Sequence, residues 1–200
     1  MPDNYIVNLN SLRQKKTGLV VCIVLTSVAP LFWVRPGEQT LTLNLLLVFA
    51  KTGSLCGTML LCWQFLLGYR RYVSTFITDL IWVVTLHKRL GIAAILLITL
   101  HPVCITFYYS LKYNINIFNV NTRYDLGLFV LIGIVAFLIL LLLLFTSAII
   151  RKRINKWNWY ILHLSSYFLM PLLFIHSITI GMTLLKTSLR AIWFAVFAAM

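Results

Sequence analysis

The sequence predicts an all-α membrane protein, a bundle of six transmembrane helices. Of its 200 residues, 61% are hydrophobic and only 10% are charged, a balance too apolar for the surface of a soluble domain of this size. The apolar residues form long blocks, and about 20 apolar residues suffice to span a bilayer as a helix. The predicted helices cover residues 18–34, 41–68, 86–110, 126–150, 158–180 and 188–200.

The two ends of the chain frame one membrane domain, predicted at residues 18–200. Residues 1–17 are polar and no signal-peptide cleavage pattern follows them, so we expect a cytoplasmic N-terminal segment and then the first membrane helix. After Arg190 only about ten residues remain, which rise about 15 Å, half of a bilayer core of about 30 Å. We therefore expect that the chain is truncated there or that a partner continues the helix.

The net charge of +13 points to membrane topology rather than to nucleic acid. The cations lie in short connections beside apolar spans, as the positive-inside rule predicts, and no nucleic-acid partner is expected. We therefore predict a multi-pass protein of the cell membrane, in contact with lipid, with a cytoplasmic N-terminus and with its third and fifth helices running outward. The dense cationic groups are Arg13, Lys15 and Lys16; Arg70, Arg71, Lys88 and Arg89; and Arg151, Lys152, Arg153 and Lys156.

Two connections have informative compositions. Residues 68–90 mix cations, aromatic and aliphatic residues, which is typical of an interfacial helix, and the second half of this segment is expected to lead directly into the third membrane helix. Residues 113–125 are rich in Asn and Tyr, which suits a water-facing outer connection.

All four histidines of the chain lie on two predicted helices. His87 and His101 are 14 residues apart, and His163 and His176 are 13 apart, which corresponds to rises of about 21 Å and about 19.5 Å. Because both helices run outward, His87 is expected level with His163 and His101 level with His176. Imidazole is a common ligand of haem iron, and ionisable residues in membrane spans are functional candidates. The pattern favours two haems, with a proton relay, a pore lining or unrelated histidines as the alternatives.

The spacing on the fifth helix conflicts with this arrangement. Fourteen residues return to within about 40° of the same helix face, whereas thirteen miss it by about 140°. An ideal helix would therefore point His163 and His176 in different directions. Pro171 lies between them, and we expect it to kink the helix and to shift its phase.

Two stretches around the histidines resemble a known family. They are LHKRLGIAAILLITLHP at residues 86–102 and WYILHLSSYFLMPLLFIHS at residues 159–177. In histidine spacing and in helix order they resemble the ferric reductase-like transmembrane domain, which ferric reductases and NADPH oxidases share. The resemblance extends over about residues 40–185.

The resemblance implies an oxidoreductase of the flavocytochrome type with two b-type haems between the third and fifth helices. His87 and His163 would ligate the inner haem, which takes electrons from a cytoplasmic FAD that NADPH or NADH reduces. His101 and His176 would ligate the outer haem, which passes electrons to a ferric chelate or to dioxygen. The chain has no GxGxxG motif, so FAD and NAD(P)H would bind a missing domain or a separate dehydrogenase partner.

Four cations near the predicted haem levels are further candidates. Lys51 is expected on the outer half of the second helix, where NADPH oxidases have an arginine at a similar place beside the outer haem. The resemblance implies contact with a haem propionate or with a negatively charged acceptor, and snorkelling to the interface is the alternative. Lys88, Arg89 and Arg151 are candidates to meet the inner-haem propionates or the FAD pyrophosphate, or act only as topology signals.

Two glycines on the second helix form a GxxxG pattern, Gly53 and Gly57. This pattern indicates close packing against another helix, and clearance for a haem edge is the alternative.

Two other functions stay open at this point. The first is the haem-binding, quinone-linked membrane subunit of a periplasmic methionine sulfoxide reductase system, a sister family of similar length. His87 favours the two-haem type over that subunit, whose third helix lacks the inner histidine. The second alternative is a haem-free multi-pass transporter or scaffold.

Overall fold

The computed structural model describes residues 3–114 and 125–198, and helices are the only regular elements in those ranges. Within them, five helical stretches are long and apolar enough to cross a membrane: Leu9–Trp33, Leu41–Gly68, Leu80–Tyr113, Gly127–Ala148 and Lys156–Ile180. The elements are α1 (Asp3–Val28), η1 (Ala29–Trp33), α2 (Leu41–Gly68), α3 (Arg70–Phe76), α4 (Leu80–Tyr113), α5 (Asp125–Ala148), η2 (Ile150–Lys152), α6 (Lys156–Leu164), α7 (Ser166–Ile180), α8 (Met182–Lys186) and α9 (Leu189–Ala198).

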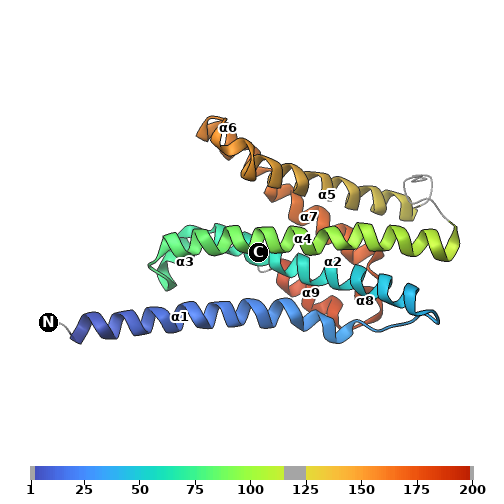
Figure 1. Cartoon of the computed structure of the whole chain (residues 1–200), viewed down its shortest axis with the longest axis horizontal. Helices are drawn as coiled ribbons and strands as arrows, with labels where there is room; N and C mark the ends of the chain where they lie inside the picture. Colours follow the sequence, from blue (N-terminus) through green and yellow to red (C-terminus); the bar gives the residue numbers. More distant parts are fainter. Residues whose placement is uncertain (1–2, 115–124, 199–200) are drawn as a thin grey trace.

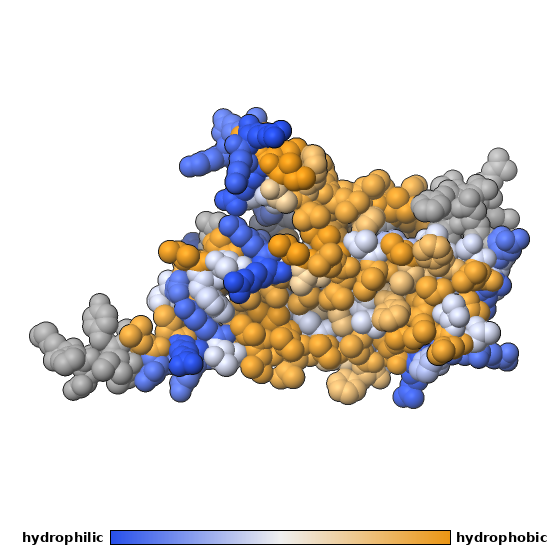
Figure 2. Space-filling view, in the orientation of Figure 1, coloured by the Kyte–Doolittle hydropathy of each residue, from blue (hydrophilic) through white to orange (hydrophobic). Residues whose placement is uncertain are grey.

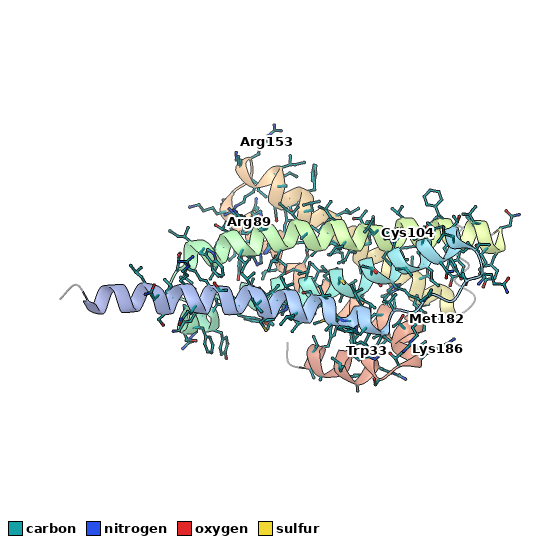
Figure 3. All side chains as sticks on the ribbon, turned by 60° about the horizontal axis from the view of Figure 1, so that its bottom comes forward. Trp33, Arg89, Cys104, Arg153, Met182 and Lys186 are labelled. Carbon is teal, nitrogen blue, oxygen red and sulfur yellow. The ribbon has the colours of Figure 1, made fainter. Side chains whose placement is uncertain are left out.

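The long helices run side by side along the longest axis of the molecule (Figure 1). The N-terminus, α3 and α6 lie at one end, which we call the basic end because Arg89 and Arg153 lie toward it (Figure 3). Trp33 and Lys186 lie toward the other end, which we call the opposite end. Figure 2 shows a broad apolar band between two charged ends, as expected for a protein that crosses a bilayer.

The GxxxG pattern brings α2 and α4 into close contact. A Cβ atom at Gly53 would overlap the carbonyl oxygen of Leu97, and one at Gly57 would lie 3.0 Å from the backbone nitrogen of Ile98. The missing side chains let the two backbones approach, which confirms the packing interpretation of the pattern. Because α2 supports α4 along most of its length, the position of both α4 histidines is fixed relative to α2.

Each end of the bundle has an ion pair that holds a connection in place. At the basic end, Lys16 of α1 binds Asp79, which also caps the start of α4, with 2.6 Å between Nζ and Oδ2. At the opposite end, Glu38 accepts hydrogen bonds of 2.5 Å from both Lys112 and the Tyr108 hydroxyl at the end of α4. The first of these two clamps joins α1 to the start of α4, and the second joins the connection before α2 to the end of α4.

The helix boundaries differ from the sequence-based ones in several places. The polar N-terminal segment is helical, since α1 begins at Asp3 rather than near residue 18. The segment after Gly68 forms the separate short helix α3, and α4 then begins at Leu80, as predicted for an interfacial stretch that leads into the third span. The predicted water-facing connection falls mostly on residues 115–124, which lie outside the described residues.

The predicted fifth and sixth helices show the largest differences. The fifth is divided in two, α6 and α7, with a break at Ser165. At the predicted sixth position α9 has only 10 residues, and its Trp193 is buried against Leu55 and Met59 of α2. The structure thus contains five candidate spans and one shorter apolar helix in the described part of the chain.

Candidate functional site

The four histidines form two pairs between α4 and the α6–α7 unit. The ring centroids of His87 and His163 are 6.5 Å apart, and those of His101 and His176 are 6.2 Å apart. These are the two pairs that the helical rise matches in height. The supporting contacts lie elsewhere, since α4 packs mainly on α2, and α7 mainly on α5. The histidines therefore face each other from two separately supported helices.

Backbone carbonyls orient both rings of the pair nearer the opposite end, the outer pair. Nδ1 of His101 lies 3.1 Å from the carbonyl oxygen of Ala50 in α2, and Nδ1 of His176 lies 2.8 Å from that of Phe129 in α5. A carbonyl oxygen can only accept a hydrogen bond, so each Nδ1 carries the hydrogen and each Nε2 keeps its lone pair. Such a bond fixes the tautomer and the ring orientation of metal-binding histidines.

Gly133 of α5 provides the space for His176. A Cβ atom at this position would overlap Cε1 and Nδ1 of the His176 ring. The glycine therefore lets the imidazole lie directly on the α5 backbone, where the carbonyl of Phe129 is in reach. Sequence reasoning missed Gly133, because only the fold shows that it faces a histidine.

Side chains surround the inner pair, at the basic end. Trp159 stacks on His163 with 4.8 Å between ring centroids and 19° between planes, and the guanidinium of Arg151 lies 4.8 Å from the centroid of the Trp159 ring. Nδ1 of His163 is buried and has no hydrogen-bond partner among the described residues. The side-chain amide of Gln64 in α2 donates to the backbone carbonyl of His87 in α4.

The break at Ser165 changes the winding between the two histidines of the fifth span. The N–H of Ser165 donates to the carbonyl of Leu162 at 3.2 Å, and the N–H of Phe168 donates to that of Ser165 at 3.1 Å. Both bonds span three residues rather than four, as in a 3₁₀ turn. The Ser165 hydroxyl also donates to the carbonyl of Leu162, at 2.7 Å, which competes with the regular helix ladder.

This overwound turn acts in the direction that the 13-residue spacing needs. Thirteen residues of ideal helix turn about 1,300°, about 140° short of four full turns, and each 3₁₀ residue adds about 20°. Two such residues add about 40° of the shift needed, and in the structure His163 and His176 each lie opposite a histidine of α4. Pro171, predicted to supply the shift, lies inside α7, six residues after this irregularity. The turn at Ser165 is a second source of phase change, and the contribution of Pro171 stays a prediction.

The two pairs fit the axial ligation of haem iron. Two imidazoles that bind one metal from opposite sides have ring centroids roughly 6 Å apart, because each metal–nitrogen bond is about 2 Å and each ring adds about 1 Å. Both pairs have this separation. No group of three or more His, Cys, Asp or Glu side chains comes together in the described ranges. A haem needs only two protein ligands, because the porphyrin supplies the other four.

The other predicted residues are spread over the two ends. Lys51 follows Ala50 on α2, and its Nζ lies 3.4 Å from the backbone carbonyl of Arg35. Arg151 contacts the inner pair through Trp159, whereas Lys88 and Arg89 are exposed on α4 directly after His87.

The comparison with known families decides the class of this protein. Residues 52–174 match the family described as "Ferric reductase like transmembrane component". The chain belongs to this family. Searches among curated proteins and among solved structures give no match. The matched range contains three of the four histidines, and His176 lies two residues beyond its end. Membership indicates a multi-pass redox component of electron transfer across a membrane.

Proposed function

We propose that this ferric reductase-like chain binds two b-type haems and conducts electrons between the two faces of the membrane. In this proposal His87 and His163 ligate the inner haem, and His101 and His176 ligate the outer haem. The observation that carries it is the matched pairing of all four histidines, with ring centroids 6.5 Å and 6.2 Å apart. A haem-free transporter would need no such pairs at two levels.

The haem iron, when bound, supplies a one-electron couple, and the residues of this chain hold and tune it. The carbonyls of Ala50 and Phe129 keep the outer imidazoles in one tautomer, with Nε2 available to the metal. At the inner level Trp159 fixes the ring plane of His163. Apolar side chains of α2, α4, α5 and α7 exclude water between the two levels.

The proposed direction of electron flow follows from the charges. The basic end would face the cytoplasm, where the positive-inside rule places dense cations, with the N-terminus on that side. A flavin dehydrogenase domain or protein carrying FAD, reduced by NAD(P)H, would dock there near Arg151, Lys88 and Arg89. At the opposite end, near Lys51, a ferric chelate or dioxygen would accept the electrons.

Haem counting in purified protein tests the proposal. We expect two b-type haems per chain by pyridine haemochrome, and one in each of the variants His101→Ala and His87→Ala. The haem left in His101→Ala should have the midpoint potential of the inner site, and that left in His87→Ala the potential of the outer site.

Other counts would contradict this arrangement. A single haem in the unmodified chain would favour the quinone-linked reductase subunit, and the absence of a Soret band would favour a transporter or scaffold. Loss of both haems, or of neither, in His101→Ala would overturn the pairing by level, provided that the variant is folded by circular dichroism.

A further inference from the structure

A groove at the basic end lies away from the histidines, between α1, α2 and α3. Its volume is about 400 Å³ and its lining is almost entirely apolar. α3 forms one wall, because this short helix connects α2 to α4 at the basic end (Figure 1). The lining residues are Lys15, Leu19, Trp63, Leu66, Leu67, Tyr72, Val73, Phe76 and Ile77.

The groove has a buried side, formed by Trp63, Leu67 and Ile77, and an exposed side, formed by α3. The indole N–H of Trp63 donates to the Thr26 hydroxyl at 2.8 Å, so its polar atom is satisfied and its ring can serve as an apolar wall. Leu67 and Ile77 are buried below it. Tyr72 and Phe76 of α3, by contrast, are 72% and 70% exposed, which is typical of aromatic residues at a membrane interface.

One cation, Lys15, lies at the groove without a carboxylate partner among the described side chains. Its neighbour Lys16 is bound by Asp79. The chain has four acidic residues, of which Glu38 is bound by Lys112 at the opposite end. Lys15 gives the groove a positive charge, and Arg13 and Arg71 are also exposed at this end of the molecule.

We propose that this groove binds an anionic phospholipid of the leaflet at the basic end, with an acyl chain along the apolar wall and the phosphate against Lys15. The occupant follows from charge and polarity together. An apolar channel lined by Leu19, Leu66 and Trp63 takes a hydrocarbon chain, and a positive charge at headgroup level takes a phosphodiester. A zwitterionic lipid offers no net charge to Lys15. The proposal does not depend on the haems.

The experiment compares two lipids that differ only in headgroup. The purified full chain in detergent is titrated with dioleoyl phosphatidylglycerol or with dioleoyl phosphatidylcholine, and Tm is followed. A ligand that binds the folded state raises Tm, and the rise grows with the logarithm of its concentration relative to its Kd. We expect phosphatidylglycerol to raise Tm at concentrations where phosphatidylcholine has little effect. Glycerol phosphate, which has the anion without the chains, should have none.

Two variants with matched controls locate the effect. Lys15→Gln should weaken the apparent affinity for phosphatidylglycerol roughly fivefold, the factor for loss of one cation near a membrane surface. Its control is Lys152→Gln, which removes a cation of the same end outside the groove. Leu66→Trp should fill the groove and abolish the selective rise in Tm. Its control, Leu142→Trp on the exposed face of α5, should retain the rise.

Several results would overturn the proposal. Equal stabilisation by both lipids would mean that the groove holds ordinary boundary lipid. An equal rise with glycerol phosphate would mean that an anion binds without a chain. Equal loss in Lys15→Gln and Lys152→Gln, or full retention in folded Leu66→Trp, would place the lipid effect elsewhere on the protein.

Discussion

The outer and inner histidine pairs are supported in different ways. At the outer level, the carbonyls of Ala50 and Phe129 hold the two imidazoles through backbone hydrogen bonds. At the inner level, His163 is held by the ring of Trp159, which in turn lies against the guanidinium of Arg151. Main-chain atoms of two neighbouring helices thus set the first level, and side chains of one helix and its preceding turn set the second.

The outer histidines therefore have rigid support from the backbone, and the inner histidines have adjustable support from side chains. A backbone carbonyl within a helix cannot move without its helix, so the outer rings are as fixed as the packing of α2 and α5. The stack at the inner level depends on side-chain rotamers at the surface of the basic end, where Arg151 is exposed. We expect haem binding at the outer level to be lost only when helix packing is disrupted. Haem binding at the inner level should respond to substitution of single nearby side chains.

The largest expected effect comes from Gly133→Ala. The added Cβ would overlap the ring of His176, so the imidazole must leave its place and its hydrogen bond to Phe129. Loss of such an orienting contact lowers metal affinity by about tenfold or more. We expect outer-haem occupancy to fall while the inner haem stays, as measured by haem content and redox titration.

The control for this variant is Gly18→Ala, at a helix position where a Cβ meets nothing within 4 Å. Both haems should remain there, with a stability gain of roughly 0.5–1 kcal/mol from the helix-favouring residue. Full occupancy of both sites in Gly133→Ala would show that His176 is not held against α5.

A smaller effect is expected from Trp159→Leu, which removes the stack at the inner level. An aromatic pair contributes about 0.5–1.5 kcal/mol beyond its buried area, which corresponds to a loss of inner-haem affinity of roughly two- to tenfold. The low-spin resonance of the inner haem should also shift in electron paramagnetic resonance. The outer signal should stay unchanged.

Trp157→Leu is the matched control, because Trp157 is 65% exposed on the same helix and contacts Tyr160 rather than a histidine. A similar shift in both variants, or a shift of the outer signal alone, would contradict side-chain support of the inner level.

The smallest effect concerns the two clamps that join the connections to α4. Hydrogen bonds from Lys112 and then Tyr108 hold the pKa of Glu38 below its usual range, and a hydrogen bond from Lys16 and then the backbone N–H of Trp82 lower the pKa of Asp79. A carboxylate with a lowered pKa stabilises the fold at neutral pH, and this contribution is lost as the pH falls below about 4.

We therefore expect Glu38→Gln and Asp79→Asn to lower Tm slightly at pH 7. Glu38→Gln should lower it more, because Glu38 receives two side-chain hydrogen bonds and Asp79 one. The differences from the unmodified protein should stay nearly constant from pH 7 to about pH 5 and shrink as the pH falls below about 4. A difference that persists unchanged well below about pH 4 would mean that the carboxylate charges do not contribute.

The sequence was most informative where one helix decides the outcome. Apolar blocks located the second, fourth and fifth spans to within two residues, whereas the first and third helices begin earlier than predicted. The rise per residue matched the histidines in level. The interfacial helix α3 and the close approach at Gly53 and Gly57 also follow from local patterns. The stack of Trp159 on His163 was not predicted, although residues four apart share a helix face.

Features that depend on two or more helices could not be found this way. The roles of Gly133, of the Phe129 carbonyl and of the Ala50 carbonyl appear only when α5 and α2 are placed beside the histidines. The phase of the fifth span was assigned to Pro171, since proline is the familiar cause of a kink. The structure adds an irregularity at Ser165, whose hydroxyl donates to the carbonyl of Leu162, and a single serine within an apolar span is too weak a signal to identify it from the sequence.

The break at Ser165 also separates the movements of the two levels. A continuous helix transmits tilt and rotation along its whole length, whereas a turn with a changed hydrogen-bond pattern acts as a joint. α6, with His163, can therefore follow a partner that presses on the basic end while α7 and His176 remain seated on α5. If electrons flow in the proposed direction, the end that would meet the donor is thus separated by this joint from the end that would meet the acceptor.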